Sequence, residues 1–408
     1  MQQSNAPWRT PALIIVAGCL IALLTFGVRA GFGLFLEPMS QDQGWGREVF
    51  AFAIALQNLL WGLGQPFAGA LADRYGSGRV LALGGLFYGL GVWLMAHAAT
   101  PWQLQLSAGV LVGLGLAGAS FAIALAAMSR AVSEERRSWV LGIGTAAGSL
   151  GQFLMVPLGQ AFLAAYGWST ALTLLGCGVL LVIPLAGVLK GRAVAGGATS
   201  ATTREQTLGE ALREASGHGG YWYLTSGFFV CGFHVAFIAT HLPAYLVDNG
   251  IAASTAAWAL ALVGLFNVIG SYSAGVLGGR YSKKYLLSSL YLTRAVVIAV
   301  FVLAPLSTVS VYLFAAAMGL LWLSTVPLTS GLVAQIFGPR YMATLFGIVF
   351  LSHQLGAFLG VWLGGYLFDN TGSYALVWWI SVALGITSAI LHWPIDERRV
   401  PRLANAAP

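Results

Sequence analysis

Residues Gly69–Arg79 read Gly-Ala-Leu-Ala-Asp-Arg-Tyr-Gly-Ser-Gly-Arg and join two long apolar runs of the chain. A related stretch, Gly275–Lys284, reads Gly-Val-Leu-Gly-Gly-Arg-Tyr-Ser-Lys-Lys and joins two other apolar runs. Glycine allows a tight turn in such a connection. The two stretches lie 206 residues apart, about half of the 408-residue chain, so they indicate two related halves.

The same offset of 206 residues relates positions inside and outside these stretches that stand in the same place relative to the apolar runs. The matching pairs are Gly44 with Gly250, Gly69 with Gly275, Arg74 with Arg280, and Tyr75 with Tyr281. Two six-helix halves joined by a linker are the plan of a rocker-switch transporter. In that plan the substrate binds near the middle of the membrane, where the halves meet.

The composition excludes a soluble globular protein. Hydrophobic residues make up 58% of the chain and charged residues 8%, whereas a soluble domain has about 25% charged residues. The first apolar run has about 24 residues and lacks a small-residue cleavage site, so we expect a retained span rather than a signal peptide. The three cysteines lie in apolar runs and are odd in number, which argues against a disulfide framework.

Apolar runs of about 20 residues or more predict an all-α integral membrane protein, with twelve transmembrane helices in two pseudo-symmetric six-helix bundles. The expected spans are Ala12–Phe35, Val49–Ala70, Val80–Ala98, Gln103–Met128, Trp139–Leu163, Ser169–Leu189, Tyr221–Leu246, Ala256–Leu277, Tyr285–Leu303, Val309–Phe337, Met342–Leu367 and Tyr374–Leu391. We expect an N-terminal bundle in residues 1–190, a cytoplasmic linker in 191–220, and a C-terminal bundle with a short cytoplasmic tail in 221–408. Within the linker, Thr203–Ala215 is a candidate amphipathic surface helix.

The basic residues alternate between connections. Seventeen of the 20 Lys and Arg residues lie at the two ends of the chain or in every second connection, while the opposite connections carry one base, Arg47. By the positive-inside rule, we expect both termini in the cytoplasm and the protein in a cell membrane, such as a bacterial inner membrane. The basic residues behind the net charge of +7 are distributed by this alternation. We therefore expect the chain to lie in a lipid bilayer and not to bind nucleic acid.

Two arginines, Arg29 and Arg294, lie within predicted spans. An arginine in hydrocarbon costs about 2.5 to 3.5 kcal/mol, and all 13 acidic residues fall at span ends or in connections. The guanidinium group of Arg29 can bind a carboxylate through two parallel hydrogen bonds, so a substrate anion is its expected partner. The alternative is a structural arginine bound to helix-end carbonyls or water. For Arg294, substrate contact or gating and packing between helices are equal alternatives.

Histidines supply further candidate substrate ligands. Shifted by 206 residues, Arg29 falls next to His234 in the seventh span, so we expect these side chains to line one cavity from opposite sides. His241 lies seven residues after His234, on nearly the same helix face, and His353 stands midway along the eleventh span. Each can donate to a carboxylate or exchange a proton, and the alternative is a hydrogen-bonded core histidine.

Among the remaining polar residues, we expect Asn58, Gln152 and Asn267 to face the pore, the alternative being hydrogen bonds between helices. Three membrane histidines without a nearby Cys, Asp or Glu make a poor metal site, so we expect neither a metal nor another cofactor. No combination of nucleophile, base and oxyanion donors is recognisable, so we do not expect an enzyme. We expect a monomer.

Residues Gly69–Arg79 resemble the signature loop between the second and third helices of the major facilitator superfamily, and Gly275–Lys284 resembles a degraded copy of it. The resemblance implies the twelve-helix fold of that superfamily. It also implies a charge latch at these loops, which biases the conformational equilibrium. The residues that it assigns to the latch are Asp73, Arg74, Arg79 and Arg280.

Within the superfamily, the chain is most similar to the monocarboxylate porters and their bacterial relatives. The residues that carry this similarity are Arg136 and Arg137 with the glycines that follow them, Pro157–Phe162, Tyr166–Trp168, and Phe337–Arg340 ahead of Gly347. The similarity implies carboxylate transport, and the basic residue of the first helix is retained as Arg29. The aspartate and arginine of the family's eighth helix fall here on Asn267 and Ser271, so the usual proton-coupling pair is absent.

The sequence thus predicts a secondary transporter of a small organic anion, by preference a monocarboxylate, that works by alternating access. Proton symport and anion exchange are both open as coupling modes. One competing hypothesis is an efflux transporter for drugs or amphipathic metabolites, although cation-drug antiporters generally rely on an intramembrane acid. A second is a sensor that binds a carboxylate without moving it, but no signalling domain is recognisable in the sequence.

Overall fold

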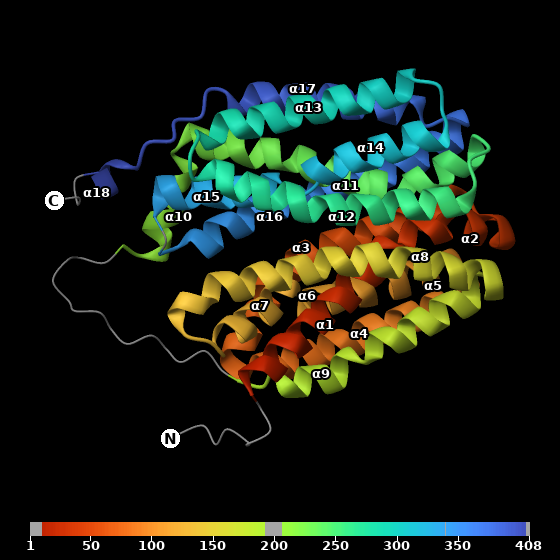
Figure 1. Cartoon of the computed structure of the whole chain (residues 1–408), viewed down its shortest axis with the longest axis horizontal. Helices are drawn as coiled ribbons and strands as arrows, with labels where there is room; N and C mark the ends of the chain where they lie inside the picture. The colour runs from red at the N-terminus through yellow and green to blue at the C-terminus, as the bar shows by residue number, and fades with distance from the viewer. Residues whose placement is uncertain (1–9, 192–205, 339, 405–408) are drawn as a thin grey trace. The chain divides into compact units, whose positions relative to one another are not determined.

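The computed structural model describes residues 10–191, 206–338 and 340–404, and every regular element in these ranges is a helix (Figure 1). The chain divides into two compact units. The first unit comprises Met1–Ala193 and Ala239–Leu265, and the second comprises Val194–Ile238 and Phe266–Pro408. Linker residues 192–205, which include part of the predicted surface helix, lie outside the described residues.

The first unit contains the helices of the first six predicted spans. They are α1 (Pro11–Ala30), η1 (Phe32–Phe35), α2 (Leu36–Gln43), α3 (Arg47–Tyr75), α4 (Ser77–Met95), α5 (Pro101–Leu104), η2 (Gln105–Leu111), α6 (Val112–Gly118), α7 (Phe121–Ser129), α8 (Glu134–Leu180) and α9 (Val182–Val188). Inside α8, Gly167 has φ 75° and ψ 170°, a conformation that glycine adopts without strain. This kink separates the fifth span from the sixth, as the sequence predicts.

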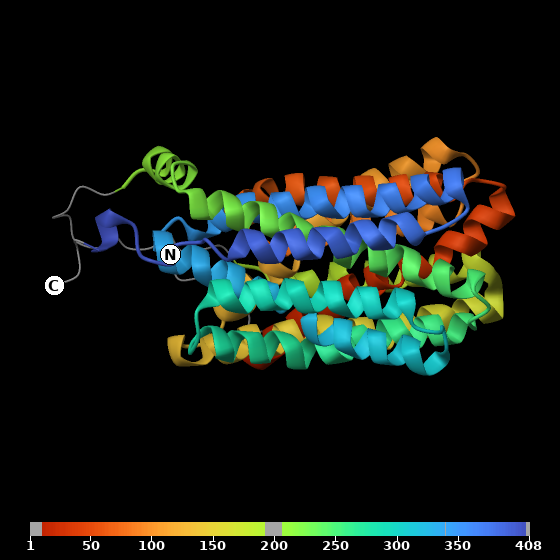
Figure 2. The same ribbon diagram turned by 90° about the horizontal axis from the view of Figure 1, so that it is seen from above.

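The second unit contains the remaining helices. They are α10 (Leu208–Ser216), α13 (Lys283–Leu303), α14 (Thr308–Leu321), α15 (Thr325–Phe337), α16 (Met342–Thr371), α17 (Ala375–His392) and α18 (Pro401–Ala404). Two helices, α11 (Gly219–Asp248) and α12 (Ala253–Gly278), contribute to both units, because the hairpin Ala239–Leu265 groups with the first unit. Within the second unit, α13 and α17 run side by side (Figures 1 and 2).

Ten helical segments in the described ranges are long and apolar enough to cross a membrane. One of them, Trp139–Val188, holds two spans because it bends at Gly167. The 29-residue helix α3 is not among the ten, because polar residues such as Gln57 and Asn58 lower its hydropathy. With these two additions, the described chain has the twelve predicted spans, and the protein is a multi-pass membrane protein.

The fourth and tenth spans are interrupted, although the sequence predicts continuous helices there. In the fourth span, α6 ends at Gly118 and α7 starts at Phe121, with Ser120 as the N-cap of α7. In the tenth span, α14 ends at Leu321 and α15 starts at Thr325. Shifted by 206 residues, the second break falls at residues 116–118, directly before the first break. The two halves therefore share this irregularity as well.

Close backbone contact brings the central helices of each unit together. In the first unit, a Cβ atom at Gly151 of α8 would overlap the carbonyl oxygen of Leu23 in α1. In the second unit, a Cβ atom at Gly232 of α11 would overlap the carbonyl oxygen of His353 in α16. Small residues at such crossings let the two helix backbones touch.

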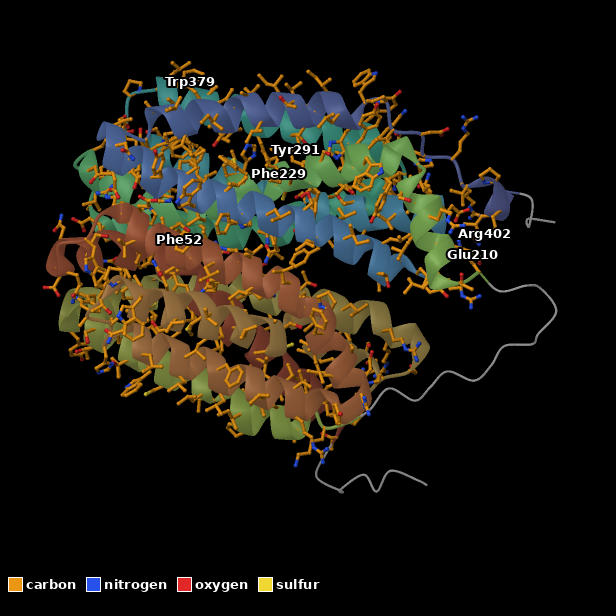
Figure 3. All side chains as sticks on the ribbon, turned by 180° about the vertical axis from the view of Figure 1, so that it is seen from behind. Phe52, Glu210, Phe229, Tyr291, Trp379 and Arg402 are labelled. Atoms are coloured by element: carbon orange, nitrogen blue, oxygen red, sulfur yellow. The ribbon has the colours of Figure 1, made fainter. Side chains whose placement is uncertain are left out.

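Figure 3 contrasts the interior and the outer surface of the second unit. Tyr291 of α13 is fully buried among the helices, whereas Trp379 of α17 lies on the outside and is 45% exposed. At one end of this unit, Arg402 of α18 donates to Glu214 of α10 (3.4 Å). The N-cap residue of α10 is Thr207, which forms a capping box with Glu210. The amphipathic helix predicted in the linker is therefore present, over its described part.

Candidate functional site

Arg29 lies near the end of α1 and is partly exposed. Its Nη2 atom donates to Oδ1 of Asn58 in α3 at 2.6 Å. The guanidinium carbon lies 4.7 Å from the centre of the Trp61 ring, one turn further along α3, in the range of a cation–π interaction. These contacts hold the guanidinium group against α3 without neutralising its charge.

One donor of Arg29 has no acceptor. The Nε atom is buried and makes no hydrogen bond, and no ion pair joins Arg29 to an acid within residues 10–191, 206–338 and 340–404. A buried donor without an acceptor costs about 1–3 kcal/mol, and more when the group is charged. An anion bound at Nε and a neighbouring nitrogen would satisfy this donor and supply the missing negative charge.

Asn58 is 1% exposed, and a hydrogen bond within α3 fixes the orientation of its side-chain amide. Its Nδ2 atom donates to the carbonyl oxygen of Ile54 (2.8 Å), so Oδ1 must face Arg29. The sequence predicts Asn58 as a substrate ligand, and the structure makes it the direct partner of Arg29.

Aromatic rings surround the guanidinium group on the same side of the first unit. Phe26 packs edge to face on Trp61, with ring centres 6.4 Å apart, and on Phe121 of α7, with ring centres 5.5 Å apart. Phe26, Trp61 and Phe121 are all partly exposed. An anion that reaches Arg29 therefore meets aromatic faces beside the positive charge.

Gln152 and His241 also lie in the first unit. Gln152 of α8 donates to the carbonyl oxygen of Leu260 in α12 (2.8 Å). His241 is fully buried in the part of α11 that belongs to this unit. In this arrangement Gln152 bridges two helices, which is the alternative that the sequence left open.

The hairpin Ala239–Leu265 is tied to the first unit by an ion pair as well. Arg47, at the start of α3, donates from Nη1 and Nη2 to the two carboxylate oxygens of Asp248, both at 2.6 Å. Arg47 is 9% exposed, and the side chain of Asp248 is 29% exposed. Nearby, a Cβ atom at Gly33 would overlap the carbonyl oxygen of Ala239, so backbone contact adds to the ion pair.

Replacing Asp248 by asparagine is expected to destabilise the protein by about 2 kcal/mol, between the values for exposed and for buried ion pairs. The reason is that Arg47 would lose its charge partner while remaining largely buried. Thermal unfolding in detergent measures the effect. The charge swap Arg47→Asp with Asp248→Arg should recover most of the stability, and a swap no more stable than the single variants would show that the pair contributes nothing.

In the second unit, Arg294 is fully buried and bonded to helix-end carbonyls. Its Nε atom donates to the carbonyl oxygen of Leu321 (3.2 Å), and Nη2 donates to the carbonyl oxygens of Leu321 and Trp322. These oxygens lie at the end of α14, where the tenth span is interrupted. Of the two roles left open by the sequence, this placement matches packing between helices.

The other predicted residues of the second unit are also engaged in the packing of that unit. His234 is fully buried and donates from Nε2 to the carbonyl oxygen of Ser381 (2.8 Å), so the proton is on Nε2. His353 is 8% exposed, and its Nδ1 lies 3.1 Å from Oε1 of Gln354. Asn267 accepts from Oγ of Ser271 and from the backbone N of Leu323, both at 3.0 Å.

At the predicted latch, Asp73, Arg74 and Arg79 are exposed, as is Arg280 in the second unit. The sequence analysis missed Arg130, which donates from Nη2 to Oγ of Ser77 at the start of α4. Burial lowers the pKa of Arg130, and the nearby carboxylate of Asp73 acts in the opposite direction. Arg130 is thus the base that holds this loop against the end of α7.

At the start of the third span and of the ninth span, a backbone N–H group donates a hydrogen bond to a residue from a distant part of the chain. The backbone N of Ser77 donates to the carbonyl oxygen of Gly191 (3.0 Å), and the backbone N of Lys284 donates to Oε1 of Glu397 (2.7 Å). Gly191 and Glu397 are 206 residues apart. The two acceptor residues thus stand at the repeat offset, whereas the donors, Ser77 and Lys284, are 207 residues apart. The sequence analysis did not use this signal.

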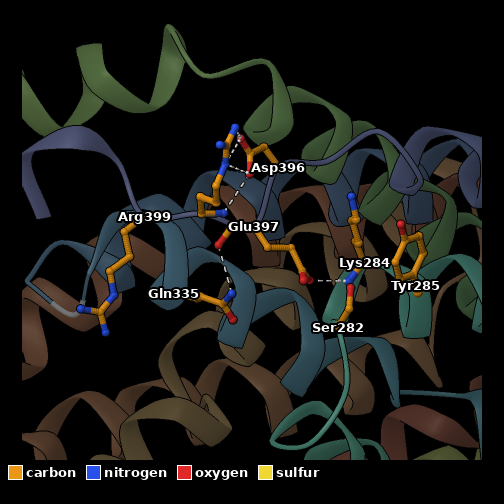
Figure 4. A pocket seen from close by; sticks show the side chains of 8 residues that line it. Ser282, Lys284, Tyr285, Gln335, Asp396, Glu397 and Arg399 are labelled. Carbon is orange, nitrogen blue, oxygen red and sulfur yellow. Dashed lines mark hydrogen bonds and ion pairs between the residues drawn. The ribbon is translucent and has the colours of Figure 1, made fainter. Parts of the chain in front are cut away.

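A surface pocket of about 800 Å³ lies beside this closure in the second unit (Figure 4). The residues that line it are Ser282, Lys284, Tyr285, Gln335, Asp396, Glu397, Arg398 and Arg399. Hydrogen bonds from Arg398 lower the pKa of Asp396 to about 2, so this carboxylate is ionised. None of the predicted substrate-binding residues lines the pocket.

Comparisons with known proteins agree with this architecture. The chain is 27% identical to monocarboxylate transporter 13 of Rattus norvegicus over 378 residues, which cover 89% of this chain and 83% of that protein. It is 25% identical to the MFS-type transporter YcxA of Bacillus subtilis (strain 168) over 379 residues, which cover 89% of this chain and 90% of that protein.

Solved structures show the same fold. A bacterial homologue of the human lysosomal transporter Spinster superimposes with a TM-score of 0.79 at 16% identity, over 98% of this chain and all of that chain. A D-xylose–proton symporter superimposes with a TM-score of 0.74 at 16% identity, over 95% of this chain and 99% of that chain. The family model described as Major Facilitator Superfamily matches residues 18–360 and 224–408. The chain therefore belongs to the major facilitator superfamily.

Proposed function

We propose that the protein is a secondary transporter that moves small organic anions, in particular monocarboxylates, by alternating access. The observation that carries the proposal is the partly exposed guanidinium group of Arg29, with one buried, unpaired donor and no acid in ion-pair contact among the described residues. The similarity to proteins named monocarboxylate transporters supports the same class of substrate.

Arg29 binds the carboxylate of the substrate, and Asn58 holds the guanidinium group in place. The rings of Phe26, Trp61 and Phe121 contact the apolar part of the substrate. His234, one residue from the repeat position that corresponds to Arg29, is a further candidate ligand of the substrate. Arg294 and Asn267 bond to the break in the tenth span, and Nη1 of Arg294 is a buried donor without an acceptor.

The protein lies in the cell membrane with both termini in the cytoplasm, as the alternation of basic residues indicates. Its two bundles comprise residues 1–190 and 221–408, joined by a cytoplasmic linker. Transport proceeds by proton symport or by anion exchange, and the two modes differ in their response to a pH gradient.

A thermal-shift screen of the purified protein tests the proposal. Acetate, pyruvate and benzoate are compared with acetamide and benzamide, which match in shape but lack the charge. A carboxylate at about 100 times its dissociation constant should stabilise the protein by about 2.7 kcal/mol, and the amides should have no effect. The Arg29→Gln variant should lose the response. Equal responses to acids and amides, or an unchanged response in the variant, would contradict the assignment.

A further inference from the structure

A chain of contacts leads from Arg29 to the break in the fourth span. It starts at the ring of Trp61, which lies over the guanidinium group. Nε1 of Trp61 donates to Oε1 of Gln65 (3.0 Å), one turn further along α3. Nε2 of Gln65 donates to Oγ of Ser120 (3.0 Å). Ser120 is the N-cap of α7, and its Oγ atom accepts from the backbone N of Ile123 (3.3 Å).

The direction of each hydrogen bond in this chain is fixed by chemistry. An indole N–H can only donate, so the amide oxygen of Gln65 must face Trp61 and its nitrogen must face Ser120. The amide of Gln65 therefore cannot turn over without breaking both bonds. Ser120 is 4% exposed, so water does not readily replace a lost bond. A change in the position of the Trp61 ring is thus passed to the start of α7.

The second half of the protein holds its own break with residues at the equivalent positions. Shifted by 206 residues, Trp61 and Gln65 fall on Asn267 and Ser271. Asn267 accepts from Ser271 and from the backbone N of Leu323, in the break of the tenth span. In both halves, a polar pair one turn apart therefore bonds to the interrupted helix. Only in the first half does this pair include a ring that contacts the arginine of the anion site.

We propose that Gln65 is a positioning residue that ties the anion site at Arg29 to the break in the fourth span, through Trp61 and Ser120. The inference rests on the proposed function, since it takes Arg29 as the ligand of a carboxylate. When an anion binds, the guanidinium group turns toward it and shifts on the Trp61 ring. Because Gln65 is hydrogen-bonded to both residues, a displacement of Trp61 also displaces Ser120. The backbone amides at the start of α7 then change their rate of hydrogen exchange with solvent.

Hydrogen–deuterium exchange of the full-length protein, with and without ligand, tests this role. The ligand is whichever of acetate, pyruvate and benzoate stabilises the wild type most. In the wild type it should change exchange in the peptide containing Ala119–Ile123. Gln65→Leu should abolish this change while keeping the dissociation constant within about threefold. Transport turnover should fall about tenfold, the size of a typical coupling between sites.

The matched control is Gln57→Leu. Gln57 lies two turns before Gln65 on the same helix and donates to the carbonyl oxygen of Ala108 (3.1 Å), also in the fourth span. This control variant should retain the ligand-dependent change at Ala119–Ile123 and the wild-type turnover. Trp61→Phe keeps an aromatic ring beside Arg29 but removes the indole N–H group with the rest of the five-membered ring, so it should also abolish the ligand-dependent change at Ala119–Ile123.

Two results would overturn the inference alone. In the first, Gln65→Leu behaves like Gln57→Leu, although Arg29→Gln abolishes carboxylate binding. In the second, Gln65→Leu weakens binding and turnover in parallel, which would mean that Gln65 only shapes the site. If no carboxylate of the panel affects the wild type, the proposed function fails and this inference fails with it.

Discussion

Replacing Arg29 by glutamine is expected to reduce carboxylate uptake by at least about thirtyfold. The expectation follows from the cost of truncating one partner of a buried charge pair, about 2–5 kcal/mol. Glutamine keeps a polar group beside Asn58 and Trp61 but removes the charge that a carboxylate requires. Initial rates of uptake of labelled benzoate or pyruvate into proteoliposomes measure the effect.

Two companion variants make the Arg29 result specific. Arg29→Lys keeps the charge but loses the planar fork, so it should retain partial uptake with a raised KM. Arg398→Gln removes an exposed arginine and should transport like the wild type. If Arg29→Gln transports as well as Arg398→Gln, while both variants unfold at the wild-type temperature, Arg29 does not bind the substrate.

Replacing Arg294 by methionine is expected to destabilise the protein by about 3 kcal/mol. The carbonyl oxygens of Leu321 and Trp322 would lose their donors in a buried part of the second unit, at about 1–3 kcal/mol for each unsatisfied group. The negative end of the α14 dipole would also lose the cation beside it. Unfolding by heat or by denaturant in detergent measures the loss.

The Arg294 variants also separate a packing role from a substrate role. Arg294→Lys retains a charged donor at the end of α14, so it should be more stable than Arg294→Met. In the folded fraction of Arg294→Lys, the dissociation constant of the carboxylate should equal that of the wild type. A Lys variant that is stable but binds a carboxylate tenfold more weakly would place Arg294 in the binding site instead.

The twelve spans could be predicted from the sequence because apolar length and the placement of bases are local properties. The kink at Gly167 was predictable for the same reason, since glycine stands between two apolar runs. The break at Trp322–Ser324 was not predicted, although Pro327 in the first turn of α15 has no N–H group to donate to the carbonyl oxygen of Leu323. Its free carbonyl and amide groups are satisfied by Arg294 and Asn267, which come from distant parts of the chain.

The part of the candidate site that could be predicted from the sequence is the part that follows from unbalanced charge within the membrane. Arg29 stands out because no acidic residue shares the membrane with it, and Asn58 is one of three residues that the sequence analysis expected to face the pore. The hydrogen bond between Arg29 and Asn58 is known only from the structure. The partner of each polar residue depends on tertiary packing and could not be predicted. Arg294 and Asn267 look like pore residues in the sequence, yet both bond to the backbone of the tenth span. Arg130 was missed because its partner, Ser77, is uncharged.

Counterflow in proteoliposomes tests the central claim that the protein moves carboxylates. Vesicles loaded with unlabelled benzoate, and separately with pyruvate, are diluted into a trace of the same labelled acid, with and without an inward proton gradient. We predict transient accumulation of label in vesicles that contain the protein. Vesicles loaded with benzamide, or lacking protein, should show none. Accumulation no greater than in protein-free vesicles for every carboxylate tested, or equal accumulation after loading with benzamide, would contradict the account.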